Sequence, residues 1–196
     1  MEGTSDDFEL ENGNGGGGGN GVTLLSEDFQ DIEVGTGSDV VPINIPGWTN
    51  AAVVGTDVWE GRAFSGDQFA QFSSYYSDDT NNEVWLITPG INLNTYTNEV
   101  LTFETATAFY THDALSVYIS TDFSGNASDI SSATWVNLEP ILAGSAQENY
   151  DWVSSGQIDL SGYSGTAYIA FRYEGSNPSS LTGTYRINNI LITAED

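Results

Sequence analysis

Apolar and polar residues alternate with a period of two in several short stretches of this chain, and each stretch predicts a β-strand with one buried face. In residues 115–120, for example, Leu115, Val117 and Ile119 occupy one side, and serine or tyrosine lies on the other. The alternation recurs in "VTLLSEDF" (22–29), "EVLTFETATAFY" (99–110), "TAYIAFRYEG" (166–175) and "TYRINNILIT" (184–193).

Clusters of Gly, Asn, Asp, Ser and Pro separate these stretches, as in "STDFSGNASD" (120–129) and "EGSNPSSLTG" (174–183). Such clusters are typical of turns and loops between strands. No window has a helical period apart from one turn near residues 126–131, and no repeat runs along the chain. Many short strands around one core predict an all-β protein, an antiparallel β-sandwich with jelly-roll topology.

The first 21 residues, "MEGTSDDFELENGNGGGGGNG", differ from everything after them. Five acidic residues and a run of five glycines cannot bury enough apolar area to offset the entropy of ordering. We therefore predict a flexible tether over residues 1–21 and one β-sandwich domain over residues 22–196. The acidic "SDD" followed by a Gly/Asn tether resembles the start of surface-exposed bacterial lipoproteins, which implies an N-terminal lipid anchor. An inter-domain linker of a larger exported protein is the alternative.

The strand segments, taken in order, resemble the cleaved-adhesin and choice-of-anchor J jelly rolls of secreted bacterial proteins, which are MAM-like in architecture. The resemblance implies a secreted or surface domain without catalytic residues of its own, often with a structural Ca²⁺. The segments that carry it are "SEDF" (26–29), "PGWT" (46–49), "NEVWLITPGINL" (82–93), "LSVYISTDFSG" (115–125), "ATWVNLEP" (133–140), "WVSSGQIDLSGYSG" (152–165), "AYIAFRY" (167–173) and "YRINNILI" (185–192).

A calcium site is expected from this resemblance and from the preference of Ca²⁺ for oxygen ligands. In a jelly roll the first and last strands can lie together, so Glu27 and Asp28 could meet Asn188 or Asn189, and Asp113 could complete the set. The chain departs from the family at Val84 and Asn188, where relatives often carry an acidic residue. The alternative is that these side chains are solvated or pair with neighbouring backbone.

Composition narrows the possible partners. The chain has a net charge of −25, from 28 acidic residues against three arginines and no lysine. Such a surface repels nucleic acids and anionic lipid, and it also disfavours acidic polysaccharides unless a divalent cation mediates. The absence of cysteine removes disulfides and thiolate sites. No apolar run reaches the roughly 20 residues of a membrane span.

Catalytic residues are scarce. The single histidine, His112, lies beside Asp113, but no serine sits on a strand-to-helix turn that would expose a nucleophile. The many acidic pairs indicate nothing by themselves, because only a cleft that tunes two carboxylates makes a glycosidase. We therefore expect a protein that is not an enzyme.

Aromatic residues suggest a binding role. We expect Trp85, Trp135 and Trp152 in the core, because apolar residues flank them. Arg172 and Arg186 are expected to pair with acids on neighbouring strands, and Arg62 either pairs with Glu60 or faces a ligand. Loops rich in Tyr, Asp and Asn can stack on a sugar and bond its hydroxyls. The candidate ligand-binding residues are Tyr75, Tyr76, Asp78, Asp79, Asn81, Tyr110 and His112.

Together these features predict a non-catalytic recognition module, secreted or displayed as an outer-membrane lipoprotein, that binds a glycan and holds a structural Ca²⁺. The alternative from another class is a scaffold that binds a surface protein partner or serves as an accessory subunit of a surface complex. Neither alternative involves nucleic acid.

Overall fold

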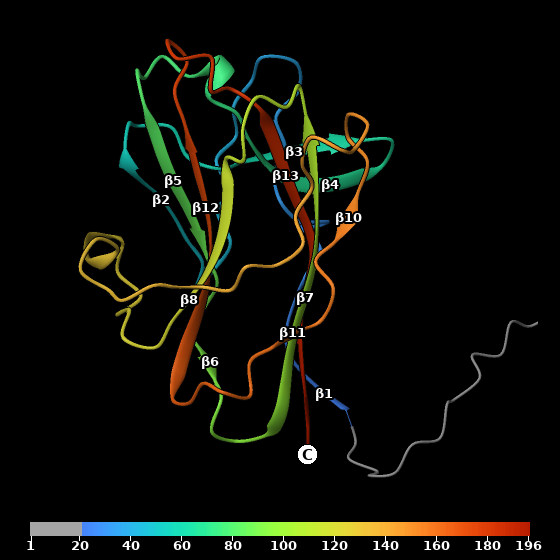
Figure 1. The fold of residues 1–196 in the computed structure, drawn as a ribbon, viewed down its shortest axis with the longest axis vertical. Coiled ribbons are helices and arrows are strands. Elements are labelled where there is room, and N and C mark those ends of the chain that lie inside the picture. The colour runs from blue at the N-terminus through green and yellow to red at the C-terminus, as the bar shows by residue number, and fades with distance from the viewer. Residues whose placement is uncertain (1–20) are drawn as a thin grey trace, which may run out of the picture.

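The computed structural model describes residues 21–196, except for the side chain of Tyr76, and shows two antiparallel sheets packed face to face (Figure 1). This confirms the predicted all-β sandwich. The tether predicted for residues 1–21 lies outside the described residues apart from Gly21, which begins the first strand.

The first sheet has the order β10-β7-β13-β4-β3, with β1 also on β13 and β11 also on β7. The second sheet has the order β2-β5-β12-β8-β9, with β6 also on β12. The strands of the first sheet are β1 (Gly21–Glu27), β3 (Glu60–Phe64), β4 (Asp67–Phe72), β7 (Thr97–Ala108), β10 (Val153–Ser154), β11 (Ile158–Asp159) and β13 (Thr184–Glu195); those of the second are β2 (Thr49–Val54), β5 (Asn82–Ile87), β6 (Ile91–Asn92), β8 (Leu115–Ser120), β9 (Val136–Asn137) and β12 (Thr166–Gly175).

The two faces of the sandwich enclose one main core. Phe171 of β12 and Phe103 of β7 meet across it, with ring centroids 5.0 Å apart and planes at 87°. Leu115, Val117 and Ile119, the residues whose alternation predicted a strand, are all buried in this core. The period of two in the sequence therefore marks the inner faces of both sheets.

A second, smaller cluster covers the outer face of β5 and β12. Trp85 is buried there beside Trp135, at a ring separation of 5.0 Å, under the segment that carries the short 3₁₀ helix η2 (Ala127–Asp129). This segment is the gold coil at the left of Figure 1. Trp85 is therefore core as predicted, and η2 is the turn expected near residues 126–131. Strand β5 is therefore covered on both faces, and on the outer face of β12 Ala170 is buried as well.

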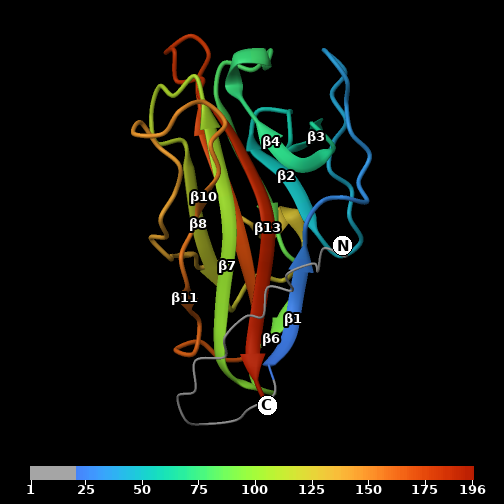
Figure 2. The same ribbon diagram turned by 90° about the vertical axis from the view of Figure 1, so that its right-hand side faces the viewer.

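Strand β13 lies at the centre of the first sheet, between β7 on one side and β4 and then β1 on the other (Figure 2). The pairing with β7 shifts register between Asn188 and Leu191, and Asn189 has a φ of 52°. A short polar residue tolerates this left-handed conformation better than most. The bulge falls where β4, which pairs up to Ile187, gives way to β1.

Candidate ligand-binding groove

A groove with a volume of about 970 Å³ lies on the outer face of the first sheet, over β3, β4 and β13. Its walls come from the 37–40 segment, Tyr75 of the 3₁₀ helix η1 (Ser74–Tyr76), and the segments that carry Phe109 and Tyr150. The strands of its floor lie together in the upper right of Figure 1. We call it the Arg186 groove, after the arginine of β13 that lines it.

Strand register builds the floor of the Arg186 groove. Arg186 of β13 lies opposite Gln71 of β4, and Gln71 lies opposite Glu60 of β3, so all three side chains point to the same face. Arg186 Nε donates to Gln71 Oε1 at 2.9 Å, and Gln71 Nε2 donates to Glu60 Oε1 at 3.4 Å. Glu60 Oε2 then accepts from Arg62 Nη2 at 2.9 Å, so one polar track crosses three strands.

Two aromatic rings hold the guanidinium group of Arg186. Its Cζ lies 4.2 Å from the ring centroid of Phe69 and 4.0 Å from that of Tyr150. Contacts of this kind orient a guanidinium group and stabilise its charge through the ring quadrupole. Burial lowers the pKa of Arg186 from its ordinary value, because desolvation disfavours the charged form.

Exposed aromatic side chains form the rim of the Arg186 groove. Tyr75 is 62% exposed, Phe109 66% and Tyr150 39%. Phe109 and Tyr150 contact each other edge to face at 6.2 Å, and both have a positive φ, 50° and 72°. Bulky residues seldom adopt this conformation, and strain of this kind clusters at binding sites.

Hydrogen bonds fix the backbone of these two rim residues. Tyr150 N donates to Thr107 O at 2.8 Å, and Phe109 N donates to Asn149 Oδ1 at 2.9 Å. The two loops are thus tied to β7 and to each other, which fixes the backbone that carries both rings before any ligand arrives.

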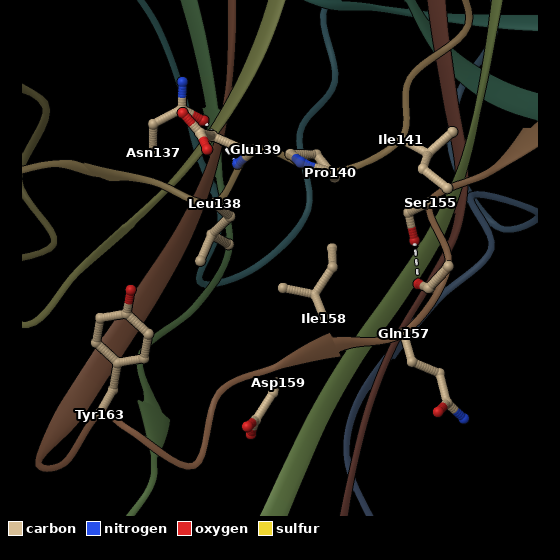
Figure 3. A pocket seen from close by; sticks show the side chains of 11 residues that line it. Asn137, Leu138, Glu139, Pro140, Ile141, Ser155, Gln157, Ile158, Asp159 and Tyr163 are labelled. Carbon is tan, nitrogen blue, oxygen red and sulfur yellow. Dashed lines mark hydrogen bonds between the residues drawn. The ribbon is translucent and has the colours of Figure 1, made fainter.

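A second cavity, the Tyr163 pocket, has a volume of about 470 Å³ and lies between β9, at the edge of the second sheet, and β11, at the edge of the first (Figure 3). Leu138, Ile158 and Tyr163 point into it, and Glu139 and Asp159 lie at its margins. The carboxylate of Asp159 accepts from Ser161 N at 2.8 Å, and this bonding lowers its pKa. A general acid in glycoside hydrolysis needs a raised pKa, so Asp159 does not suit that role.

Of the predicted ligand-binding residues, only Tyr75 lines the Arg186 groove. The side chain of Tyr76 lies outside the described part of the chain. Asp78 and Asn81 are exposed in the loop before β5. Asp79 holds that loop to another, because its Oδ2 accepts from Thr56 N at 2.6 Å and Thr56 Oγ1 at 3.1 Å. These bonds lower the pKa of Asp79.

Tyr110 and His112 also make structural contacts rather than facing the groove. Tyr110 donates to Asp113 Oδ1 at 2.9 Å. His112 Nε2 lies 2.8 Å from the carbonyl oxygen of Glu174 and Nδ1 lies 3.0 Å from Thr111 Oγ1. A carbonyl only accepts, so these partners assign the proton to Nε2 and place Thr111 as the donor to Nδ1. His112 therefore ties its loop to the end of β12.

The residues predicted to bind calcium do not gather around one point. Glu27 lies on β1 opposite Ile190 of β13, the residue that follows Asn188 and Asn189. The first and last strands are therefore adjacent, as expected. Asn188, however, donates to Asp67 at 3.3 Å and Asn189 donates to Glu104 at 2.6 Å. Asp28 accepts from Gln30 N at 3.1 Å, and Asp113 lies apart, beside Tyr110. Within residues 21–196, no three acidic or histidine side chains converge to hold a metal.

Within residues 21–196, two of the three arginines form ion pairs as expected, and the third does not. Arg172 pairs with Glu83 at 3.0 Å and with Glu174 at 2.6 Å, as predicted, and Arg62 pairs with Glu60. Arg186 was expected to pair as well, but it makes no ion pair with any side chain that the structure describes. Its neighbours across the sheet are Gln71 and Ala106, which carry no charge. No short-range signal in the sequence distinguishes Arg186 from Arg172, because both lie in alternating strand patterns.

Solved structures share this fold. The K3 cleaved adhesin domain of Lys-gingipain from Porphyromonas gingivalis is 21% identical, with a TM-score of 0.56 over 89% of this chain and 99% of that domain. The K1 cleaved adhesin domain of the same protein is 20% identical, with a TM-score of 0.56 over 91% of this chain and 100% of that domain. These likenesses confirm a cleaved-adhesin type of jelly roll.

A xylan-binding domain from Paenibacillus barcinonensis is 15% identical, with a TM-score of 0.49 over 92% of this chain and 99% of that domain. A likeness this distant gives no ground for transferring its ligand. No curated protein matches the chain, and no helix within residues 21–196 is long and apolar enough to cross a membrane.

The strands from β4 to β13 correspond to a known family. Its model matches residues 65–195, which is most of the chain and includes Gln71, Phe109, Tyr150 and Arg186. The chain therefore belongs to the family described as a domain of unknown function, DUF5017.

Proposed function

We propose that this domain is a non-catalytic recognition module, secreted or displayed at a cell surface, and that it binds a glycan in the Arg186 groove. The observation that carries the proposal is the combination of exposed aromatic rings, Tyr75, Phe109 and Tyr150, with a polar floor in one cavity of ligand size. Binding sites for small ligands are typically clefts of roughly 300–1,000 Å³ with a few well-placed polar groups.

The chemistry of the Arg186 groove suits a pyranose. The rim rings offer flat apolar surfaces for the C–H face of a sugar, and Gln71, Thr182 and Thr184 line the groove with amide and hydroxyl groups. Because the groove lies on a sheet and its rim loops are held by backbone hydrogen bonds, little conformational entropy is lost when a ligand binds. Asp159 and His112, the two groups considered for acid–base chemistry, are engaged in structural hydrogen bonds.

We expect the Tyr150→Ala and Phe109→Ala variants to bind at least about tenfold more weakly to any glycan that the unmodified chain binds. A tenfold loss corresponds to about 1.4 kcal/mol for a lost aromatic contact. The measurement is a glycan array followed by isothermal titration with the best ligand. Tyr163→Ala, in the other cavity, is the matched control and should bind as the unmodified chain does.

Two outcomes would count against glycan binding in the Arg186 groove. One is that the domain binds no glycan on the array. The other is that Tyr163→Ala weakens binding as much as Tyr150→Ala, which would move the site to the Tyr163 pocket.

A protein partner is the second candidate, because Val40 and Phe64 add exposed apolar surface to the same groove. Exposed apolar patches of this kind also mark protein–protein contacts. A surface protein that binds the domain, and whose binding Phe64→Ala abolishes while glycan titrations remain flat, would favour this alternative.

Calcium remains a prediction, and Glu27 is the residue at which to test it. Burial raises the pKa of Glu27, and the nearby charges of Asp28 and Asp31 raise it further. Its Oε1 accepts from Phe29 N at 2.7 Å, a bond that glutamine could retain. A cation at this site would relieve the repulsion among these acids.

We expect Glu27→Gln to stabilise the calcium-free domain at pH 7 by about 0.5 kcal/mol, after allowance for solvent screening. A raised pKa means that the folded state holds the proton more tightly, so the ionised form costs stability above that pKa. The difference between variant and unmodified chain should disappear as the pH falls below 4.5, the ordinary glutamate value. Melting curves across pH measure it.

The same curves with added Ca²⁺ or with EDTA test the ion. Calcium bound by Glu27 would raise the melting temperature of the unmodified chain and leave that of Glu27→Gln unchanged, because a ligand that binds only the native state must stabilise it. Equal responses from both proteins would contradict a site at Glu27.

A further inference from the structure

We propose that the ligand of the Arg186 groove is an acidic glycan, and that Arg186 binds the carboxylate of one of its uronic acid residues. This inference rests on the proposed function, since it names the class of glycan that the groove would take. It does not follow from overall charge, which by itself disfavours acidic polysaccharides.

Positive charge is concentrated in the Arg186 groove. The chain has three arginines and no lysine, and two of them, Arg62 and Arg186, line this cavity. Glu60 is the one acidic residue among those that line it. Two positive side chains and one negative side chain leave the groove with a local charge of +1, in a chain whose net charge is −25.

Glu60 does not neutralise Arg186. Its Oε2 accepts from Arg62 at 2.9 Å, and its Oε1 lies 3.4 Å from the amide nitrogen of Gln71. The neutral side chain of Gln71 therefore stands between Arg186 and the only carboxylate in the groove. The floor places the positive charge of Arg186 at one end of a polar track and the pair of Arg62 and Glu60 at the other.

Arg186 keeps its terminal nitrogens for a ligand. Its Nε donates to Gln71 Oε1 at 2.9 Å. Among the side chains that the structure describes, neither Nη atom has a hydrogen-bond partner. The rings of Phe69 and Tyr150 lie against the guanidinium group, 4.2 and 4.0 Å from Cζ, and the edge that carries the two Nη atoms remains for a ligand. That edge is the part of arginine that binds a planar carboxylate through two parallel hydrogen bonds.

Arg172 shows what an arginine does elsewhere in this acidic chain. It also stacks on a ring, with Cζ 5.5 Å from the Trp85 centroid, but it forms ion pairs with Glu83 and Glu174. Half-buried charges are ordinarily paired in this way, because an unpaired charge loses hydration without compensation. The lowered pKa of Arg186 agrees with such an uncompensated charge. An anionic ligand supplies the missing partner.

The acidic surface does not prevent this binding. At physiological ionic strength, charges more than about 8 Å apart in solvent are largely screened from each other. The distant acidic residues therefore slow the approach of an anion more than they weaken its contact with Arg186 inside the groove. Uronic acids fit because they combine a carboxylate with a pyranose ring that Tyr75, Phe109 or Tyr150 can stack against.

The test compares two sugars that differ at one carbon. Methyl β-D-glucuronide and methyl β-D-glucoside are titrated into the full chain and followed by amide chemical shifts, at pH 7, in low salt and with EDTA present. We expect the glucuronide to bind at least about tenfold more tightly. Methyl glucoside 6-sulfate, which carries a non-planar anion at the same carbon, should bind more weakly than the glucuronide.

The matched variants are Arg186→Gln and Arg172→Gln, because each removes one positive charge and so changes the net charge equally. The preference for the glucuronide should disappear in Arg186→Gln and persist in Arg172→Gln. Arg186→Lys keeps the positive charge and is the second variant to use if Arg186→Gln does not fold. It should lose most of the preference for the glucuronide, because lysine lacks the planar guanidinium group.

Equal binding of both sugars would overturn the acidic class and leave glycan binding in place, whereas no binding of either sugar or of any arrayed glycan would overturn the proposed function itself. A preference that Arg172→Gln removes, or a 6-sulfate that binds more tightly than the glucuronide, would also contradict the assignment to Arg186.

Discussion

Phe171→Ala is expected to lower the free energy of unfolding by about 3–5 kcal/mol, the range typical of a large aromatic residue removed from a core. Phe171 is fully buried at the centre of β12, a strand that pairs with β5 on one side and β8 on the other. Its ring packs edge to face on Phe103 of the opposite sheet. Urea unfolding followed by tryptophan fluorescence measures the loss.

The cost is large because the cavity cannot close. The backbone around Phe171 is held by two strand pairings, so neighbouring side chains can shift only a little into the space left by the ring. Phe64→Ala, an exposed phenylalanine on β3, is the control and should change stability by no more than about 0.5 kcal/mol. A loss below about 1 kcal/mol for Phe171→Ala would contradict the placement of this residue in the main core.

The second large effect concerns one buried hydroxyl group. Tyr173 donates through its hydroxyl to Gly183 O at 2.8 Å and accepts from Ser74 N at 3.2 Å. Tyr173→Phe leaves both backbone groups without this partner, so we expect it to lower the free energy of unfolding by about 1–3 kcal/mol. Urea unfolding measures that loss.

The same hydroxyl group supports the Arg186 groove, because Ser74 begins η1, which carries Tyr75, and Gly183 lies between the lining residues Thr182 and Thr184. Tyr173→Phe should therefore also increase amide hydrogen exchange in residues 73–77 and 181–184. Tyr185→Phe is the matched control: its hydroxyl lies at a longer 3.4 Å from His112 O, so a smaller loss is expected. Equal losses for the two variants would show that the short bonds of Tyr173 add nothing.

The period of two predicted the strands well, and the structure shows why. Leu115, Val117 and Ile119 face the main core because successive residues of a strand point to opposite faces. The run around Trp85 lacks that alternation, since β5 is covered on both faces, by the main core and by the second cluster. Flanking apolar residues still indicated correctly that Trp85 is buried.

The functional residues were harder to predict. Tyr75 came from the composition of its loop and does line the Arg186 groove. Asp79, Tyr110 and His112 come from equally polar loops, yet each makes a structural hydrogen bond: Asp79 to a second loop, Tyr110 within its own loop and His112 to β12. Polar loop residues serve both purposes, and only the hydrogen bonds in the folded chain distinguish a ligand contact from a structural tie.

The sequence by itself determined the class of fold, the inner faces of the main strands and the acidity of the surface, because these depend on alternation and composition. Only the tertiary structure decided where an unpaired positive charge lies. Arg186 and Gln71 are 115 positions apart and meet because β13 and β4 pair in one register. Whether an arginine in a strand pairs with a carboxylate depends on its cross-strand neighbours. These neighbours are set by the register of strand pairing, which depends on packing of the whole sandwich.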